Sequence, residues 1–309
     1  MVRESPQTDR ILLLMDLLMA DPGQGRTLAE IARHLGTAKA TCYPMLIALT
    51  RAGWLVRHPR RKTYQLGPAL IPIGHAAAGA IDVVDHARDA MHALADAADM
   101  VCLGFVPSAT DLVVAELIQP ARGRRGSLGL RLGDRIDFAP PLGAVAAARL
   151  PREQLAQWYE RGERDLGIPA TRLEEAYFPA LQLIRERGFA VEHLGRGGAG
   201  IAEVIQERRG QHALSLQYLA AGPTLQELSG NPHADVLLRE IQPDADYRVV
   251  TISAAVFNAD HAPALVLSLV DAPEPLPGAR VNELGEQICA AAADITARIG
   301  GAAPSGATG

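Results

Sequence analysis

Apolar residues near the start of the chain recur three or four positions apart, which is the period of an amphipathic helix. This pattern predicts a helix from Thr8 to Ala20, and the Asp-Pro-Gly-Gln-Gly that follows predicts where it ends. The apolar positions that define this helix are Ile11, Leu12, Met15, Leu18 and Met19. We therefore expect residues 1–7 to be disordered and an ordered domain to begin at residue 8.

Two further helices are predicted beyond it, joined by a tight turn. The run Thr27-Leu-Ala-Glu30 is a capping box, in which the Thr27 hydroxyl and the Glu30 carboxylate satisfy free amides at a helix start. Gly36 allows a sharp turn, and Thr37 can cap a third helix over residues 38–52. The inward positions of these two helices are Ile31, Ala32, Leu35, Cys42, Met45, Leu46 and Leu49.

The small residues between the two helices have the spacing of a helix-turn-helix. Ala32 lets the helices cross closely, and Gly36, four residues later, permits the angle between them. An ordinary helical hairpin in a bundle has the same spacing, so the spacing alone does not distinguish it from a helix-turn-helix. The hairpin and the charge that follow favour the DNA-binding motif.

A short hairpin is predicted after the third helix. Residues 54–57 and 63–66 read as paired strands around His58-Pro-Arg-Arg-Lys62. Three consecutive cations at a hairpin tip repel one another unless they meet phosphates. The hairpin therefore predicts a wing that lies along a DNA backbone or minor groove while the third helix enters the major groove. The alternative is a solvated basic turn.

The charge of the chain is divided between its two parts. The net charge is −5, but residues 1–75 hold ten Lys and Arg against five Asp and Glu, which leaves −10 for the remainder. Between Ile31 and Ile81 there is no acidic residue. The seven basic residues of that stretch are Arg33, Lys39, Arg51, Arg57, Arg60, Arg61 and Lys62. A stretch of one charge sign indicates a negatively charged partner, here double-stranded DNA.

The remaining two thirds of the chain mix strand and helix patterns. Antiparallel hairpins combined with helices predict an α+β domain whose sheet curves over a pocket. A turn at residues 258–261 joins the last two strands. Strands are predicted at 100–106, 111–118, 127–132, 247–257 and 263–270, and helices at 82–98, 142–150, 152–161, 171–187 and 278–299.

Length and composition limit the class of protein. With 309 residues and 48% hydrophobic residues the chain is long enough for two packed domains. The three cysteines are far apart and lack CxxC spacing, which argues against a disulfide framework or a zinc site. No run of 18 apolar residues and no secretory leader is evident, so we expect a cytoplasmic protein without a membrane partner.

Catalytic motifs are scarce. The chain has no GxSxG, no HExxH and no P-loop lysine, and we expect no catalytic residues, no metal and no cofactor. One exception is the GxGxxG at Gly195–Gly200, which follows a strand pattern. We interpret it as a loop, because the helix pattern after it is short. A GAF-like or nucleotide-binding enzyme that uses this loop is the alternative hypothesis.

The N-terminal third resembles the winged helix-turn-helix of the IclR family of transcriptional regulators. Tyr64, Leu66 and Gly67 match the motif that closes the family's wing. The resemblance implies that Lys39, Thr41 and Tyr43 of the recognition helix face DNA, and the basic residues of the predicted wing are expected to hold the phosphate backbone. The expected DNA-binding residues are Thr27, Lys39, Thr41, Tyr43, Arg57, Arg60, Arg61 and Lys62.

One residue of the third helix departs from the family pattern. Pro44 stands where the family usually has a basic residue, and it removes the amide that would bond the Ala40 carbonyl. We predict a kink between these two residues.

The C-terminal part resembles the GAF-like effector-binding domain of the same family. Residues 131–150 match its central strand, loop and helix, and residues 252–270 match its late hairpin. The family often has a cysteine at Thr251, and a His and a Lys near Ala139 and Ala144, so we expect a more apolar pocket and a different ligand. The expected effector-binding residues are Leu130, Ala139, Pro140, Leu142, Gly143, Thr251 and Ser253.

The resemblance implies a ligand-responsive transcriptional regulator. We expect a DNA-binding domain at 8–75, a linker helix at 76–99 and an effector-binding domain at 100–299, with an insertion at about 193–246 and a disordered tail at 300–309. A homodimer or tetramer would bind a palindromic operator, and a small organic effector would modulate that binding.

Overall fold

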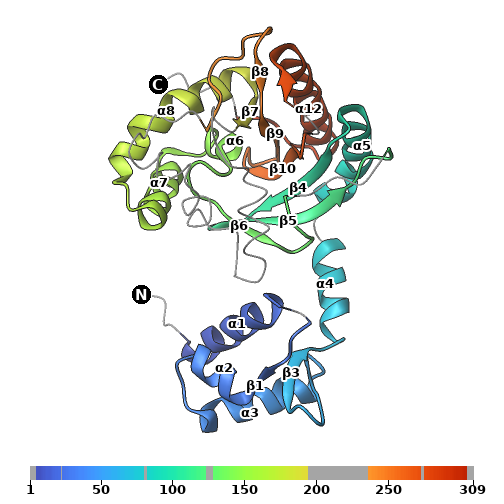
Figure 1. Cartoon of the computed structure of the whole chain (residues 1–309), viewed down its shortest axis with the longest axis vertical. Coiled ribbons are helices and arrows are strands. Elements are labelled where there is room, and N and C mark those ends of the chain that lie inside the picture. Colours follow the sequence, from blue (N-terminus) through green and yellow to red (C-terminus); the bar gives the residue numbers. More distant parts are fainter. Residues whose placement is uncertain are drawn as a thin grey trace. The chain divides into compact units, whose positions relative to one another are not determined.

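The computed structural model describes residues 5–21, 23–79, 82–122, 128–193, 236–272 and 275–304. The chain divides into two compact units between residues 80 and 81 (Figure 1). Each unit has its own hydrophobic core, and the larger unit has one such core on each face of its main sheet. The predicted α+β class, with a winged helical unit followed by a sheet-based unit, is confirmed.

The N-terminal unit is a winged helix-turn-helix. Its helices are α1 (Pro6–Met19), α2 (Leu28–His34) and α3 (Lys39–Arg51), and its strands are β1 (Arg26–Thr27), β2 (Leu55–Arg57) and β3 (Thr63–Leu66). The strands pair antiparallel in the order β1-β3-β2. Gly36 adopts the left-handed conformation, with φ of +59°, at the turn between α2 and α3. Leu14, Ile31, Leu46, Leu55 and Tyr64 are fully buried at the centre.

The first helix differs from its prediction in two ways. It begins at Pro6, so the expectation that residues 1–7 are disordered is wrong for Pro6 and Gln7. It buries Leu14 and Leu18, whereas Leu12 and Met19, two of the apolar positions that predicted the helix, are exposed. The spacing rule finds the helix but not its buried face, because apolar residues lie on more than one side of it.

The helix-turn-helix has the predicted cap on α2 but not on α3. Thr27 and Glu30 form the capping box at the start of α2. The N-cap of α3 is Ala38 rather than Thr37, and it has no side-chain hydrogen bond. The amide of Thr37 donates to the Ala32 carbonyl, which fixes this residue in the turn before the helix. The α-helix α3 continues through Pro44, and the kink there stays a prediction.

Helical structure resumes earlier than predicted after the wing. The helix α4 (Leu70–Gly79) begins at Leu70, ahead of the expected linker start at residue 76, and α5 (Asp82–Ala98) follows. The α5 residues Val84, Ala87, Met91 and Leu94 are buried at helical spacing against the sheet of the second unit.

The second unit is built on a six-stranded antiparallel sheet with the order β6-β5-β4-β10-β9-β7. Helices α5 and α12 (Gly278–Arg298) cover one face, and the short α6 (Ala144–Ala147), α7 (Arg152–Leu166) and α8 (Ala170–Arg187) cover the other. The sheet consists of β4 (Val101–Pro107), β5 (Asp111–Ile118), β6 (Arg135–Asp137), β7 (Phe189–His193), β9 (Val249–Phe257) and β10 (Pro263–Val270). A separate pair joins β8 (Asp246–Tyr247) to β11 (Leu276–Pro277).

Three sequence-based predictions in this unit are wrong. Leu128 and Gly129 have φ of 53° and 78°, which an extended strand does not allow, so the strand expected at 127–132 is a turned segment where it is described. The helix predicted at 142–150 is only the four residues of α6. Residues 300–304 of the expected disordered tail are ordered, because Gly301 and Ala302 donate amide hydrogen bonds to the Thr296 and Asn258 carbonyls.

The predicted insertion at 193–246 is described only in part. Its residues from 236 onward run along the outer edge of β7, where His193 donates to the Val236 carbonyl and Leu238 donates to the Val191 carbonyl. The Gly195–Gly200 loop, on which the enzyme alternative rests, lies outside the described residues.

Candidate functional site

The exposed face of α3 carries three of the expected DNA-binding residues. Cys42, Met45 and Leu46 are buried in the core of the unit. Lys39, Thr41 and Tyr43 are exposed, and the Tyr43 side chain keeps 46% of its surface accessible. Lys39 and Tyr43 are four residues apart, so they are neighbours on the helix surface. The face opposite the core therefore presents a cation and a phenol at the start of the helix.

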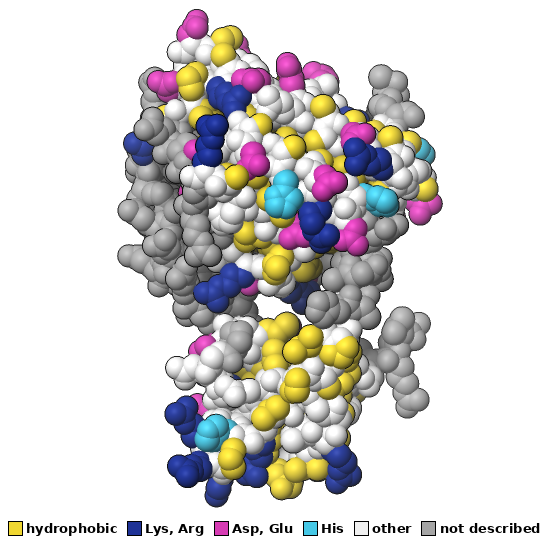
Figure 2. All heavy atoms as spheres, turned by 90° about the vertical axis from the view of Figure 1, so that its right-hand side faces the viewer, with side chains coloured by type: hydrophobic (Ala, Val, Ile, Leu, Met, Phe, Trp, Pro, Cys, Tyr) yellow, Lys and Arg dark blue, Asp and Glu magenta, His cyan; other side chains and the backbone are white. Residues whose placement is uncertain are grey.

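The hairpin between β2 and β3 carries four more of the expected DNA-binding residues, all of them basic and exposed. Its loop is closed by the His58 amide, which donates to the Thr63 carbonyl at 2.8 Å, and by the Lys62 amide, which donates to the His58 carbonyl at 2.9 Å. The Arg61 amide donates to Nδ1 of His58. Within the described residues none of the hairpin cations forms an ion pair, and all are exposed. They are Arg57, Arg60, Arg61 and Lys62. Figure 2 shows basic side chains collected at one end of this unit.

Two of the expected DNA-binding residues also make contacts within the unit. The Arg57 guanidinium lies 5.7 Å from the ring centre of the buried Tyr64, its partner on β3. The Thr27 amide and hydroxyl both donate to Glu30, at 2.7 and 2.8 Å, and the Glu30 amide donates back to the hydroxyl. These bonds lower the pKa of Glu30. The Thr27 side chain is thus engaged in fixing the start of α2.

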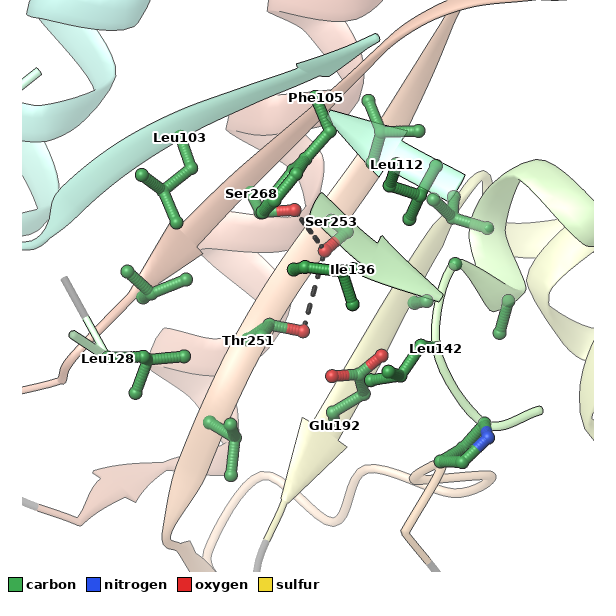
Figure 3. Close-up of a pocket in the computed structure, with 18 of the residues that line it drawn as sticks. Leu103, Phe105, Leu112, Leu128, Ile136, Leu142, Glu192, Thr251, Ser253 and Ser268 are labelled. Carbon is green, nitrogen blue, oxygen red and sulfur yellow. Dashed lines mark hydrogen bonds between the residues drawn. The ribbon is translucent and has the colours of Figure 1, made fainter. Parts of the chain in front are cut away.

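The second unit contains a pocket on the face of the sheet that α6, α7 and α8 cover. Its cavity volume is about 90 Å³. Strands β4, β9 and β10 supply alternate residues, which lie on one face of the sheet because successive side chains of a strand point to opposite sides. The edge strand β6 and the loop before α6 complete the lining of the pocket with Ile136 and Leu142, respectively (Figure 3).

One side of the pocket is polar. Glu192 on β7 lies opposite Thr251 on β9, and Ser253 lies opposite Ser268 on β10. The Ser253 hydroxyl is 2.8 Å from that of Ser268 and donates to Oγ1 of Thr251 at 3.4 Å. Figure 3 shows these oxygens following one another along the pocket. Two adjacent cross-strand pairs therefore provide a carboxyl group and three hydroxyls.

The carboxyl group of this row is strongly perturbed. Burial raises the pKa of Glu192 to about 7, while a hydrogen bond with Thr251 acts in the opposite direction. Glu192 is consequently divided between its neutral and its ionised form near neutral pH.

The loop that closes the pocket is fixed by α7. The Trp158 indole donates to the Leu142 carbonyl at 3.2 Å, and the Arg161 guanidinium donates to the Phe138 carbonyl at 2.6 Å. Gly143 has φ of +70°, and a Cβ there would lie 2.7 Å from the Phe138 ring. Only glycine fits this position without displacing the ring, so the lining residues of the loop are rigidly placed.

The structure brings together five of the seven residues that were expected to line the pocket. These are Leu130, Leu142, Gly143, Thr251 and Ser253. Ala139 is fully buried outside the lining, and Pro140 packs against Gly162 of α7, while the neighbouring Pro141 lines the pocket. Glu192 and Ser268, which also line the pocket, were not predicted from the sequence. The alternation of Phe189–His193 places Glu192 on the same face as Ala190, but which face looks into the pocket depends on pairing with β9.

The IclR helix-turn-helix domain family matches residues 7–59. The HTH-type transcriptional regulator XynR of Escherichia coli K12 is 25% identical over 188 residues, which cover 60% of this chain and 73% of XynR. Residues 7–59 therefore carry an IclR-type helix-turn-helix domain, and the chain as a whole is similar to regulators of the IclR family. XynR is by name a regulator of transcription.

Solved structures share the fold of this chain over nearly its whole length. An IclR transcriptional regulator from Alicyclobacillus acidocaldarius has a TM-score of 0.67 at 22% identity, covering 96% of this chain and 100% of its own. An IclR homologue from Microbacterium hydrocarbonoxydans, solved with 4-hydroxybenzoate, has a TM-score of 0.55 at 15% identity and covers 95% of this chain and 98% of its own.

The described part of the chain lacks two other features. Its His, Cys, Asp and Glu side chains form no group of three or more that could hold a metal ion. None of its helices there combines the length and hydrophobicity needed to cross a bilayer.

Proposed function

We propose that this IclR-family regulator binds a palindromic operator as a homodimer, and that a small molecule in the pocket of the second unit modulates this binding. The observation that carries the proposal is the exposed basic surface formed by the start of α3 and the β2–β3 hairpin. Lys39 and Tyr43 are exposed on α3, and the cations of the hairpin have no anionic partner among the described residues. Phosphates supply the missing negative charge.

Each element has a separate task in this proposal. The helix α3 enters the major groove, where Lys39, Thr41 and Tyr43 meet base edges or adjacent phosphates. The hairpin residues Arg57 and Arg60–Lys62 hold the backbone or the minor groove. Thr27 acts through the capping box, which sets the start of α2 against the duplex.

An exposed apolar surface on the first unit supports a dimer. Large apolar side chains there keep between 45% and 61% of their surface accessible, which is unusual for a small soluble unit. They are Leu12, Leu13, Met19, Ile71 and Ile73. Figure 2 shows apolar side chains spread over this unit beside the basic ones. Two copies joined through such a surface would present two recognition helices to the two halves of a palindrome.

The pocket supports an effector. It is lined mainly by apolar side chains with a few convergent polar groups, which is typical of small-molecule sites. The Microbacterium homologue was solved with 4-hydroxybenzoate, an organic molecule of modest size. An effector changes DNA binding only if it binds the DNA-competent and incompetent states with different affinity.

The test begins with DNA fragments that the full chain selects from its own genome. Footprinting of a selected fragment should protect two inverted half-sites, with centres one helical turn or a multiple apart. Analytical ultracentrifugation of the complex should give two chains, or four, per palindrome. Protection of a single half-site by one chain would contradict the proposal.

A further inference from the structure

The single acidic group of the pocket lies among hydroxyls and apolar side chains. Glu192 is opposite Thr251 in the β7–β9 register, and Ser253 is two residues further along β9 on the same face. Ser268 extends the row through its 2.8 Å contact with Ser253. The other described lining residues are apolar or glycine, among them Leu103, Phe105 and Val266.

No positively charged side chain of the described residues lines the pocket beside this carboxyl group. Among the lining residues that the structure describes there is no Arg, Lys or His, and Glu192 is the one acidic member. Tyr177 on α8 is a titratable group close enough to be affected: burial, and after it the charge of Glu192, raises the pKa of Tyr177 to about 12. A phenol offers no positive charge. An ionised carboxylate in apolar surroundings is costly unless a cation joins it, and none of the described lining residues supplies that cation.

The neighbouring hydroxyls suit a ligand that donates hydrogen bonds. An ammonium group has three donors and no acceptor. The Glu192 carboxylate and the hydroxyl oxygens of Thr251 and Ser253 are three acceptors on adjacent positions of two paired strands. A carboxylate ligand has only acceptors, and it would bring a second negative charge against Glu192.

We infer that the pocket selects a small primary amine, whose ammonium group pairs with Glu192 and the hydroxyls of Thr251 and Ser253 while its apolar part contacts Leu103 and Phe105. This inference rests on the proposed function, because it names the chemical class of the effector. It departs from the 4-hydroxybenzoate found with the Microbacterium homologue, which carries an acid group.

The cavity also limits the size of the ligand. At about 90 Å³ it is smaller than the cavity of roughly 150 Å³ that accepts benzene in an engineered protein. A short aliphatic amine is of the right order, and a larger ligand would have to extend beyond the cavity described here.

The test compares three four-carbon compounds that differ only at their polar end: n-butylamine, n-butanol and butyrate. Each is titrated calorimetrically into the full chain at pH 7.5 and constant ionic strength. The inference predicts that butylamine binds at least about tenfold more tightly than the other two, since hydrogen bonds to charged groups are the stronger ones. Equal binding, tighter binding of butyrate, or no binding of any compound overturns it.

Two variants assign the preference to Glu192. Glu192→Gln keeps the shape of the side chain but removes its charge, and it should weaken butylamine binding by about 10- to 100-fold while leaving butanol within a few-fold. Glu153→Gln, on the exposed surface of α7, is the matched control and should bind butylamine like the unmodified chain. Retention of butylamine binding by Glu192→Gln, with its fold intact by circular dichroism, would refute the assignment.

A separate readout distinguishes the ligand class from the proposed function. The effect of butylamine on the affinity of the full chain for its selected DNA fragment is measured beside the calorimetry. Selective butylamine binding without any change in DNA affinity supports the ligand class but contradicts the effector role. A change in DNA affinity caused by butyrate and not by butylamine supports the effector role and overturns the ligand class.

Discussion

Glu192 and Thr251 lie opposite one another on the paired strands β7 and β9, with their side chains directed into the pocket of the second unit. Glu192 belongs to a strand that is otherwise apolar on this face, since Ala190, two residues earlier, lines the same pocket. A carboxyl group in this position makes folding depend on its own protonation. The protonation state of Glu192 therefore affects both the stability of the chain and the proposed pairing with an amine.

The first prediction concerns the pH dependence of this link. The pKa of Glu192 is raised from 4.5 to about 7, so between these values the folded chain retains a proton that the unfolded chain loses. Stability is therefore lost as pH rises through this range. Relative to the unmodified chain, Glu192→Gln should be equally stable near pH 4.5 and more stable by up to about 3 kcal/mol at pH 8. Urea unfolding at both values measures this difference, and a pH-independent difference would contradict it.

The second prediction concerns the loop that closes the pocket. Gly143→Ala adds a Cβ 2.7 Å from the Phe138 ring at φ of +70°, so it combines backbone strain with overpacking. Gly133→Ala is the matched control, because its φ is +85° but no atom lies within 4 Å of the added Cβ. We expect Gly133→Ala to cost about 1–2 kcal/mol and Gly143→Ala about 1–3 kcal/mol more, measured by urea unfolding. Equal losses would show that the Phe138 contact is not tight.

The third prediction concerns the wing. Replacing Arg60, Arg61 and Lys62 with alanine removes up to three phosphate contacts, and each lost contact should reduce the slope of log affinity against log salt by about 0.9. Fluorescence anisotropy with a labelled duplex measures the slope. Arg152→Ala, which removes an exposed cation from α7 in the second unit, should leave it unchanged. An unaltered slope in the triple variant would exclude a wing that contacts the backbone.

The fourth prediction concerns Pro44. It is exposed within α3 and cannot donate to the Ala40 carbonyl. Pro44→Ala restores that donor and should slow hydrogen exchange of the α3 amides by an amount equivalent to as much as about 3 kcal/mol. Unchanged exchange would mean that the helix already accommodates the proline without cost.

Local signals in the sequence predicted much of the DNA-binding unit. The Thr27–Glu30 capping box, the Gly36 turn and the β2–β3 hairpin each depend on residues within a few positions of one another, and all three are present. The buried face of α1 was not predicted, because it depends on which apolar side meets α2 and the sheet. The Thr37 cap failed for a related reason, since its backbone is held in the turn by Ala32.

The pocket was less predictable, because its polar row is made by strands far apart in the chain. Thr251 and Ser253 were found through their place in the late hairpin, but Glu192 joins them only through the β7–β9 register. The segment at 128–132 reads as an apolar strand, yet the positive φ of Leu128 and Gly129 turns it. The pattern of hydrophobic residues in a sequence does not show that a leucine has a positive φ.

The central claim is that the first unit recognises double-stranded DNA through α3 and the β2–β3 hairpin. The most direct measurement is the affinity of the full chain for its selected duplex and for a scrambled duplex of equal length, over a range of salt concentrations. The selected duplex should bind at least about 1000-fold more tightly, and both affinities should fall as salt rises. Equal affinities for the two duplexes, or affinities that do not change with salt, would contradict the claim.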